Sequence, residues 1–425
     1  MPPDVDAAVA ELYHSDWGRI VATLIRLVGD FEIAEEAVQE AFTAGLNQWR
    51  TAGVPEFPRA WIIQTARHKA IDLIRGRTRS QEKAALYVSE LDQTVDHPEF
   101  DGGEIPDDRL RLIFTCCHPA LAPDAQVALT LRTLGGLETD EIARAFLVPP
   151  ATMAQRIVRA KRKIRDARIP YAVPGTSDMP ERVGAVLTVI YLIFNEGYVA
   201  TRGGPLVRTD LCAEAIRLGR LVRSLLAPAP PSEATGLLAL MLLHDARREA
   251  RLDGAGDLVI LDQQDRSLWD RRQIAEALPL VTEAFRGGAG PITLQASIAA
   301  QHCQAARPED TDWPQILRLY DELERLQPSS IVSLNRAVAV AMVHGPRAAL
   351  AIIDDLAGEL SEYHLLHSAR ADLLRRLGET VEAAQAYRRA LALVGNHSER
   401  RFLERRLREV EATSSTRDAS SPTPA

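Results

Sequence analysis

The spacing of apolar residues constrains the fold of this chain more than any other feature. In the stretch EIAEEAVQEAFTAGL, apolar side chains recur every three or four positions, at Ala34, Ala37, Val38, Ala41, Phe42 and Leu46. This spacing places them along one face of a helix. Runs of β-branched residues are short, while Ala, Leu, Arg and Glu are abundant. The sequence therefore predicts an all-α protein.

Length and charge limit the classes of protein that the chain can form. With 425 residues, 46% of them apolar, it is too long for one ordinary core and is expected to form several domains. No apolar run is long enough for a transmembrane helix, and the N-terminal MPPDVDAAVAELYHSDW is unlike a signal peptide. We expect a cytoplasmic protein with no membrane partner. Because the formal net charge is −8, any binding of nucleic acid must depend on local charge pattern.

Breaks in the helical pattern divide the chain into segments. A stretch rich in Asp and Glu follows the first helical unit and is expected to be irregular. Helix pairs near the end have roughly the length of tetratricopeptide (TPR) repeats, and the tail TSSTRDASSPTPA is expected to be disordered. The predicted segments are a helical unit at 5–77, an acidic linker at 78–108, a second compact unit at 109–170, a helical middle domain at 181–286, degenerate TPR-like repeats at 290–410 and the tail at 411–425.

The predicted segment at residues 109–170 ends in the basic stretch FLVPPATMAQRIVRAKRKIR. A short helix, ETDEIARAFL, precedes it, and Val148-Pro149-Pro150 forms a turn, so this region is predicted to be a helix-turn-helix. One stripe of the second helix should pack inward: Met153, Ile157, Ala160 and Ile164. The opposite stripe should face outward: Thr152, Gln155, Arg156, Arg159 and Lys163.

The outward stripe carries the residue types that a DNA recognition helix needs. Thr and Gln near its N-terminal end can reach base edges, and Arg can bond bidentately to guanine or to phosphate. Lys161, Arg162, Arg165 and Arg168 would hold the DNA backbone. The alternative is a basic helix end that only complements the helix dipole. The acidic helix and tight turn before it favour contact with DNA.

The predicted helical segment at residues 5–77 combines an acidic helix face with a basic one. The acidic face consists of Glu32, Glu35, Glu36, Gln39 and Glu40. After the break TAGVPEFPRA, the helix WIIQTARHKAIDLIRGRTR turns apolar residues towards a core, namely Trp61, Ile62, Ala66, Ala70 and Leu73. Its outward residues are Arg67, Lys69, Arg75, Arg77 and Arg79. Each face could be a solvated surface or a binding surface.

Together, AEEAVQEAFTAGL, FPRAWIIQTARHKAIDLIRGR and LRTLGGLETDEIARAFLVPPATMAQRIVRAKRKIR resemble regions 2 and 4 of the extracytoplasmic-function (ECF) sigma factors of bacterial RNA polymerase. The resemblance covers roughly residues 5–170, and the order of the regions and the short acidic linker agree with it. The later segments IYLIFNEGY and LLHDARREARLD are similar to the subgroup with a TPR-containing C-terminal extension. Glu138, in place of a Ser or Thr cap, and the Pro149-Pro150 turn depart from the usual pattern, so the first helix of the motif is expected to start near Thr139.

The resemblance implies partners and roles for these residues. The acidic face (Glu32, Glu35, Glu36, Gln39 and Glu40) would dock on the β′ clamp helices of core polymerase, and the β flap of core polymerase is a second expected partner surface. Loop 51–60 would read the −10 element by capturing an unstacked base, with the DNA held by Arg59, Arg67, Lys69, Arg75 and Arg77. The −35 element would be bound by Thr152, Gln155, Arg156, Arg159, Lys161, Arg162 and Lys163. Trp61 is expected to lie in the core rather than to stack on a base.

Catalytic and metal-binding patterns are not found in the sequence. It has no P-loop and no GxGxxG, HExxH or GxSxG motif. The pair His244-Asp245 and the stretch Asp262–Arg266 are better explained by helix ends and interhelical hydrogen bonds than by an acid–base site. The run Cys116-Cys117-His118 is expected to be buried thiols, because neighbours on one helical turn chelate poorly. We expect no enzyme activity, metal or cofactor.

Three hypotheses for function follow. The first is a sigma factor that binds core polymerase and promoter DNA, with an extension that regulates or supports it, by contact with the sigma domains or with a separate protein. The second is a stand-alone helix-turn-helix regulator with a TPR interaction module. The third is a scaffold with a vestigial helix-turn-helix. The pairing of regions 2 and 4 favours the first.

Overall fold

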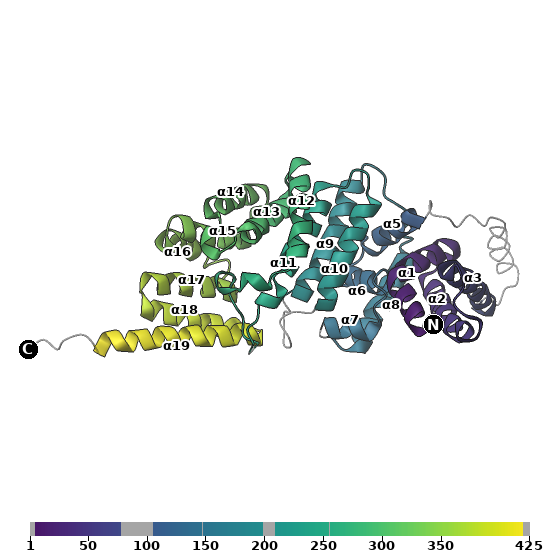
Figure 1. Cartoon of the computed structure of the whole chain (residues 1–425), viewed down its shortest axis with the longest axis horizontal. Coiled ribbons are helices and arrows are strands. Elements are labelled where there is room, and N and C mark those ends of the chain that lie inside the picture. The colour runs from purple at the N-terminus through teal and green to yellow at the C-terminus, as the bar shows by residue number, and fades with distance from the viewer. Residues whose placement is uncertain (1–4, 78–104, 147, 199–208, 255, 420–425) are drawn as a thin grey trace, which may run out of the picture. The chain divides into compact units, whose positions relative to one another are not determined.

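The structure, a computed structural model, describes residues 5–77, 105–146, 148–198, 209–254 and 256–419 (Figure 1). These residues form helices and one isolated antiparallel bridge, Leu252–Leu258, but no strand. The predicted all-α class with a helical extension is confirmed. Among the described helices, none combines the length and the apolar character needed to cross a bilayer.

The chain divides into two compact units, Met1–Ile193 and Phe194–Ala425. The division falls inside α9 (Met179–Tyr198), so the first helix of the extension belongs largely to the first unit, whereas the sequence predicted a break before residue 181. Most of the predicted acidic linker lies outside the described residues, and its last four residues already belong to a helix that begins at Ile105.

The first unit consists of two groups of helices that precede α9. The first group is α1 (Val5–Val28), α2 (Phe31–Ala52) and α3 (Pro58–Arg77), and the second is α5 (Ile105–Cys116), α6 (Pro123–Thr133), α7 (Thr139–Ala145) and α8 (Pro150–Asp166). Asp30 caps α2 by accepting hydrogen bonds from the backbone N–H groups of Glu32 (2.8 Å) and Ile33 (3.0 Å). Gly53, with a φ of 83°, lets the chain leave α2.

Aromatic residues lie at the centre of the core of the first group of helices. Trp17 is 1% exposed, and its ring lies 4.7 Å from that of Tyr13 and 6.3 Å from that of Phe42. Both Cys116 and Cys117 are buried, as predicted, and their thiols contact the hydroxyl groups of Thr133 (3.2 Å) and Thr130 (3.6 Å). These contacts fix α5 against α6.

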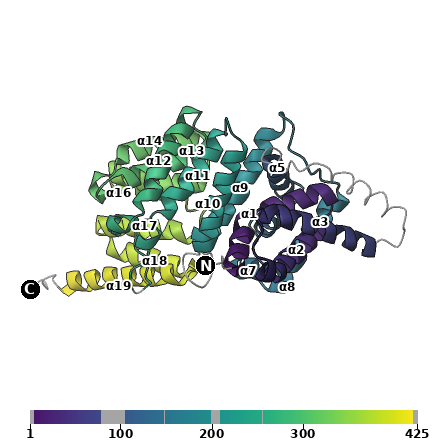
Figure 2. The ribbon, with the colours of Figure 1, turned by 45° about the vertical axis from the view of Figure 1, so that its right-hand side comes forward.

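In the second unit, helices pack mainly against their neighbours in the sequence (Figures 1 and 2). Its helices are α10 (Thr209–Leu225), α11 (Ser232–Asp245), α12 (Arg271–Arg286), α13 (Pro291–Gln304), α14 (Trp313–Leu326), α15 (Ser330–Val343), α16 (Pro346–Asp355), α17 (His364–Leu377), α18 (Thr380–Leu393) and α19 (His397–Ala419). Packing between successive helices is typical of repeat arrays, but the assignment to TPR repeats stays a prediction. Because α19 runs to Ala419, it includes much of the segment that was predicted to be disordered.

Candidate nucleic-acid and polymerase interface

Helix α8 has the two-sided character that the sequence predicts. Its apolar stripe is buried: Met153, Ile157, Ala160 and Ile164. On the other side, Thr152, Gln155, Arg159, Arg162 and Lys163 are exposed. The helix begins at Pro150, where a missing backbone N–H costs nothing, and α7 begins at Thr139 as expected. Glu141 reaches back to the backbone N–H of Glu138 (2.7 Å), which supplies the reciprocal half of a capping box.

Two of the predicted −35 residues are engaged within the protein. Arg156 is half-buried and lies 3.3 Å from a carboxylate oxygen of Asp124, at the start of α6. Lys161 is largely buried, and its ammonium group donates a 2.9 Å hydrogen bond to Glu35 of α2. Both side chains would have to leave these partners to reach DNA.

Glu35 differs most from its sequence prediction. It was expected on an exposed acidic face, but it is 6% exposed and lies between α2 and α8, which Figures 1 and 2 show beside each other. A second cation, Arg132 of α6, approaches the same carboxylate at 3.7 Å and also binds Glu138 at 2.9 Å. Of the other predicted docking residues, Glu32, Gln39 and Glu40 are exposed and Glu36 is half-buried.

Further hydrogen bonds hold the two groups of helices together. The indole N–H of Trp17 donates to the carbonyl oxygen of Arg132 (3.3 Å), and the Tyr171 hydroxyl donates to the carbonyl oxygen of Ala22 (2.9 Å). A Cβ atom on Gly18 would lie 2.8 Å from the carbonyl oxygen of Leu134, so only glycine allows this approach. Burial raises the pKa of Tyr171 above its ordinary value.

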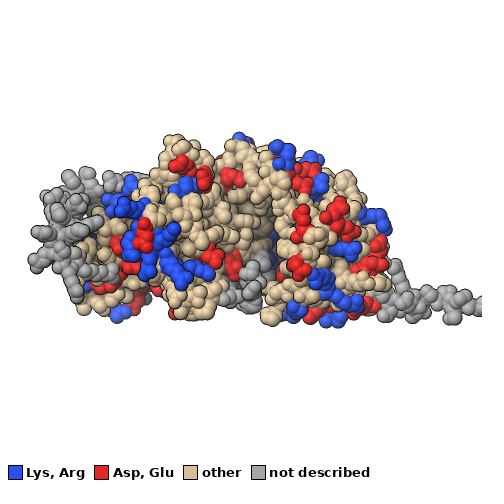
Figure 3. All heavy atoms as spheres, turned by 180° about the vertical axis from the view of Figure 1, so that it is seen from behind, with Lys and Arg blue, Asp and Glu red and all other residues tan. Residues whose placement is uncertain are grey.

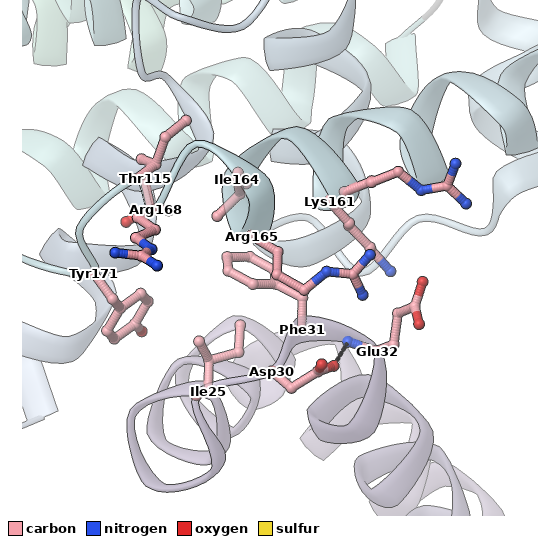
Figure 4. A pocket seen from close by; sticks show the side chains of 13 residues that line it. Ile25, Asp30, Phe31, Glu32, Thr115, Lys161, Ile164, Arg165, Arg168 and Tyr171 are labelled. Carbon is pink, nitrogen blue, oxygen red and sulfur yellow. Dashed lines mark hydrogen bonds between the residues drawn. The ribbon is translucent and has the colours of Figure 1, made fainter. Parts of the chain in front are cut away.

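A cavity of about 340 Å³ opens between the start of α2 and the end of α8 (Figure 4). Basic side chains of α8 and the turn after it line one side, among them Lys161, Arg165 and Arg168, and the capped N-terminus of α2 lines the other. Figure 3 shows basic side chains gathered over one face of the first unit, with acidic side chains beside them. The predicted DNA-binding and docking surfaces thus meet at this cavity.

The predicted −10 residues lie along α3 and just before it. Arg59 is partly buried and pairs with Asp16 at 3.3 Å, and Lys69 pairs with Glu40 at 3.3 Å. Arg75 is exposed, while Arg67 is half-buried, with its Nε and Nη2 atoms lacking a hydrogen-bond partner among the described residues. The side chain of Arg77 lies outside the described residues.

Two aromatic residues near the start of α3 behave differently. Trp61 is half-buried and packs edge-on against Trp49, with ring centres 5.3 Å apart. Phe57, which was not among the predicted site residues, is 68% exposed in the predicted −10 loop. Its side chain, the one aromatic ring in the stretch TAGVPEFPRA, was the available signal. An exposed ring of this kind can stack on an unpaired base.

Comparison with known families agrees with this arrangement. Residues 12–80 match the family described as Sigma-70 region 2, and residues 111–164 match Sigma-70, region 4. These ranges correspond to α1–α3 and to α5–α8. Residues 182–285 match a family of unknown function, DUF6596, and no solved structure matches the chain. The helices and the two matches together support a sigma factor of transcription initiation.

Comparison with individual proteins extends the match to the second unit. The chain belongs to the same family as an uncharacterised protein of Rhizobium meliloti, to which it is 46% identical over 93% of its own length and 94% of that protein. It is also 30% identical to a probable ECF RNA polymerase sigma factor, SigI, of Mycobacterium tuberculosis, over 39% of this chain and 57% of SigI. Identity to the ECF sigma factor SigK of Mycobacterium bovis is 26%, over 38% of this chain and 85% of SigK.

Proposed function

We propose that this chain is a sigma factor that binds core RNA polymerase and directs promoter-specific initiation, and that its helical extension regulates this activity. The observation that carries the proposal is the exposed polar stripe of α8, held on a region 4 domain that follows a region 2 domain in the same compact unit. Thr152, Gln155 and Arg159 can reach the edges of −35 bases from the major groove. Neither role requires a catalytic residue.

Promoter melting is assigned to the loop before α3. Phe57 offers a stacking surface for an unpaired base, while the arginines and lysine of α3 supply positive charge for the adjacent phosphates. Trp61, half-buried against Trp49, is assigned a packing role.

The docking surface for the β′ clamp helices is assigned to the predicted acidic face of α2. Since Glu35 of this face is buried against Lys161 and Arg132, we propose that the arrangement described here is a closed form. Core binding would separate α8 from α2. Glu35 would then become available to polymerase, and Lys161 to DNA.

Cross-linking tests the closed form. The variants Glu35→Cys and Lys161→Cys, combined in one chain and joined by a short bismaleimide, should bind core polymerase less than the same variant before cross-linking, and cleavage of a reducible linker should return binding to that level. The four native cysteines are buried and should not react. A matched control joins the exposed pair Arg220 and Glu276, 2.9 Å apart in the second unit, after the same substitutions. Full core binding by the cross-linked closed form would contradict the proposal.

Run-off transcription tests the function itself. The chain should retain core polymerase in a pull-down and should support specific transcription only when core polymerase is added. Tight promoter binding without core polymerase would instead favour the stand-alone helix-turn-helix regulator. Failure to bind core polymerase would remove the sigma factor proposal.

The role of the extension is tested by truncation. A chain that ends at Ile193 keeps the whole first unit, including Tyr171 and its hydrogen bonds. Higher activity of the truncated chain would indicate an inhibitory extension, and lower activity would indicate one that supports initiation. Unchanged activity under all conditions would contradict a regulatory role.

A further inference from the structure

Three arginines of the second unit are buried close together between α11 and α12. Arg247, Arg251 and Arg266 are 8%, 7% and 6% exposed. A guanidinium group keeps its charge in proteins, and a buried charge normally needs a partner of opposite sign. We call these three residues, together with Trp269 and His302, the arginine cluster.

Within the described part of the chain, none of the three arginines forms an ion pair with a carboxylate. The buried carboxylate nearby, Asp245, pairs through Oδ2 with Arg248 and accepts a 2.9 Å hydrogen bond from Gln273 on the same oxygen, while its Oδ1 is buried and forms no hydrogen bond with the described residues. The arginine cluster therefore holds an excess of buried positive charge.

The arginines of the arginine cluster adjoin one another through two aromatic rings. The Cζ atoms of Arg266 and Arg247 lie over the Trp269 ring, 4.8 Å and 5.8 Å from its centre. Arg251 lies over the ring of Tyr198 at 3.7 Å, and the hydroxyl of Tyr198 accepts a 3.3 Å hydrogen bond from Arg247. The positive groups thus form one continuous site.

Two histidines lie beside these arginines and do not balance their positive charge. His244 lies 3.0 Å from Nη2 of Arg247, and burial, followed by the charges of Arg247 and Arg251, lowers its pKa. Burial, followed by the charges of Arg247 and Arg266, lowers the pKa of His302 to about 4. Both imidazoles are neutral at pH 7.

Helix ends satisfy some of the guanidinium hydrogens. Arg266 donates through Nη1 to the carbonyl oxygens of His302 (2.8 Å) and Ala305 (2.6 Å) at the end of α13, and Arg251 donates through Nη1 to the carbonyl oxygen of Tyr198 at the end of α9. Such contacts favour cations through the helix dipole. A purely structural role would therefore explain these Nη1 atoms.

Other donors of the arginine cluster are left over. Nε and Nη2 of Arg266, Nε of Arg247 and Nε1 of Trp269 are buried and have no hydrogen-bond partner among the described residues. Buried donors are nearly always hydrogen-bonded in proteins. Four donors on three adjacent side chains, all lacking an acceptor, indicate that an acceptor from outside the chain belongs there.

We propose that the arginine cluster binds the oxyanion group, a carboxylate or a phosphate, of a small molecule. Both anions match the planar fork of a guanidinium, and either would neutralise the excess charge and accept the unused N–H groups. The cluster lies mostly within residues 182–285, the segment that matches a family of unknown function, so the proposal gives that segment a ligand-binding role. It does not depend on the first unit being a sigma factor.

Binding is tested first on the full chain. Thermal unfolding and titration calorimetry are carried out with sodium phosphate and with sodium acetate, each against sodium chloride at equal ionic strength. One of the two oxyanions should raise the unfolding midpoint above the chloride value and bind with a stoichiometry of one. The anion that does so separates a phosphate ligand from a carboxylate ligand. An effect no larger than that of chloride for both anions would overturn the proposal.

Substitutions then locate the site. Arg266→Lys keeps the positive charge but removes the guanidinium fork and should weaken binding about tenfold or more. The control is Arg272→Lys, an exposed arginine at the start of α12, and it should bind as the unsubstituted chain does. Equal affinity of the two variants would overturn the assignment.

A spectroscopic measurement does not depend on how the Arg266 variant folds. In the unsubstituted chain, the indole N–H resonance of Trp269, assigned by its loss in Trp269→Phe, should shift as the anion is added. Indole resonances in the first unit, such as that of Trp17, should not move. A Trp269 resonance that stays constant through saturation would contradict anion binding at this place.

Discussion

The two units each bury positive charge, but they balance it differently. In the first unit, Glu35 stands between Lys161 and Arg132, so the buried cations and their carboxylate belong to the same chain. In the second unit, three buried guanidinium groups share no carboxylate among the described residues. Buried cations that are paired with a carboxylate of the same chain can hold a closed conformation without a ligand. Buried cations that lack such a carboxylate are suited to bind an anionic ligand.

The largest expected effect comes from removing the carboxylate of the first unit. Glu35→Gln keeps the shape of the side chain but leaves Lys161 largely buried without its counter-ion, while Arg132 keeps its pair with Glu138. We expect a loss of about 3 kcal/mol in the stability of the contact between α2 and α8, measured by hydrogen exchange. Glu40→Gln is the control, because its pair with Lys69 is exposed and should contribute under about 1 kcal/mol. Similar losses in the two variants would remove the distinction between the units.

The pH dependence of the second unit is the next effect in size. The folded pKa of His302, about 4, is below the ordinary value of 6.5, so the unfolded chain binds the proton more tightly. The stability due to neutral His302 is therefore complete above pH 6.5 and falls as the pH decreases towards 4, by about 2 kcal/mol at pH 5. Urea unfolding of the second unit at pH 7 and pH 5 measures it, and His302→Gln should reduce the difference. A saturating oxyanion should reduce it as well, because it raises the pKa of His302. An unchanged pH dependence in His302→Gln would contradict this account.

An exposed charge should affect function and leave stability alone. Arg159→Ala removes a side chain from the outer stripe of α8, where it is exposed. Transcription from a promoter that depends on its −35 element should fall roughly tenfold, with core binding and thermal stability nearly unchanged. The matched control, Arg272→Ala in the second unit, should transcribe normally. Loss of core binding by Arg159→Ala would indicate misfolding instead.

The smallest predicted effect concerns an exposed ring that carries no charge. Phe57→Ala should lower initiation on duplex promoters about fivefold, because it removes a surface for stacking an unpaired base. Phe57→Tyr should retain activity, and a promoter that is already melted should rescue the alanine variant. A defect that persists on the melted promoter would contradict a role in melting.

Local structure in the first unit could be predicted closely from the sequence. The start of α8 at Pro150 and its buried stripe follow from proline chemistry and helical periodicity, both of which act within one turn. The burial of Glu35 could not be predicted in this way, because Lys161 lies 126 positions further along the chain. Periodicity describes which face of α2 is apolar and says nothing of what covers the rest.

The arginine cluster was missed for a related reason. In the sequence, the pair His244-Asp245 and the stretch that ends in Arg266 are explained by helix ends and hydrogen bonds. Part of that explanation agrees with the contacts of Arg266 at the end of α13. Arginine is usually a surface residue, so its type gives no warning of burial. The nearby signal was Trp269, three positions after Arg266, because an indole ring can cover a guanidinium group.

The buried thiols allow local opening of the unmodified chain to be measured by alkylation. Cys116 and Cys117 lie in the first unit, and Cys212 and Cys303 lie in the second. Burial raises the pKa of Cys117 to about 12 and also raises that of Cys303, and alkylating reagents attack an accessible thiolate. Each thiol therefore reacts only when its surroundings open. Peptide mass spectrometry after timed alkylation can then measure the rate of opening of each unit separately in a single sample.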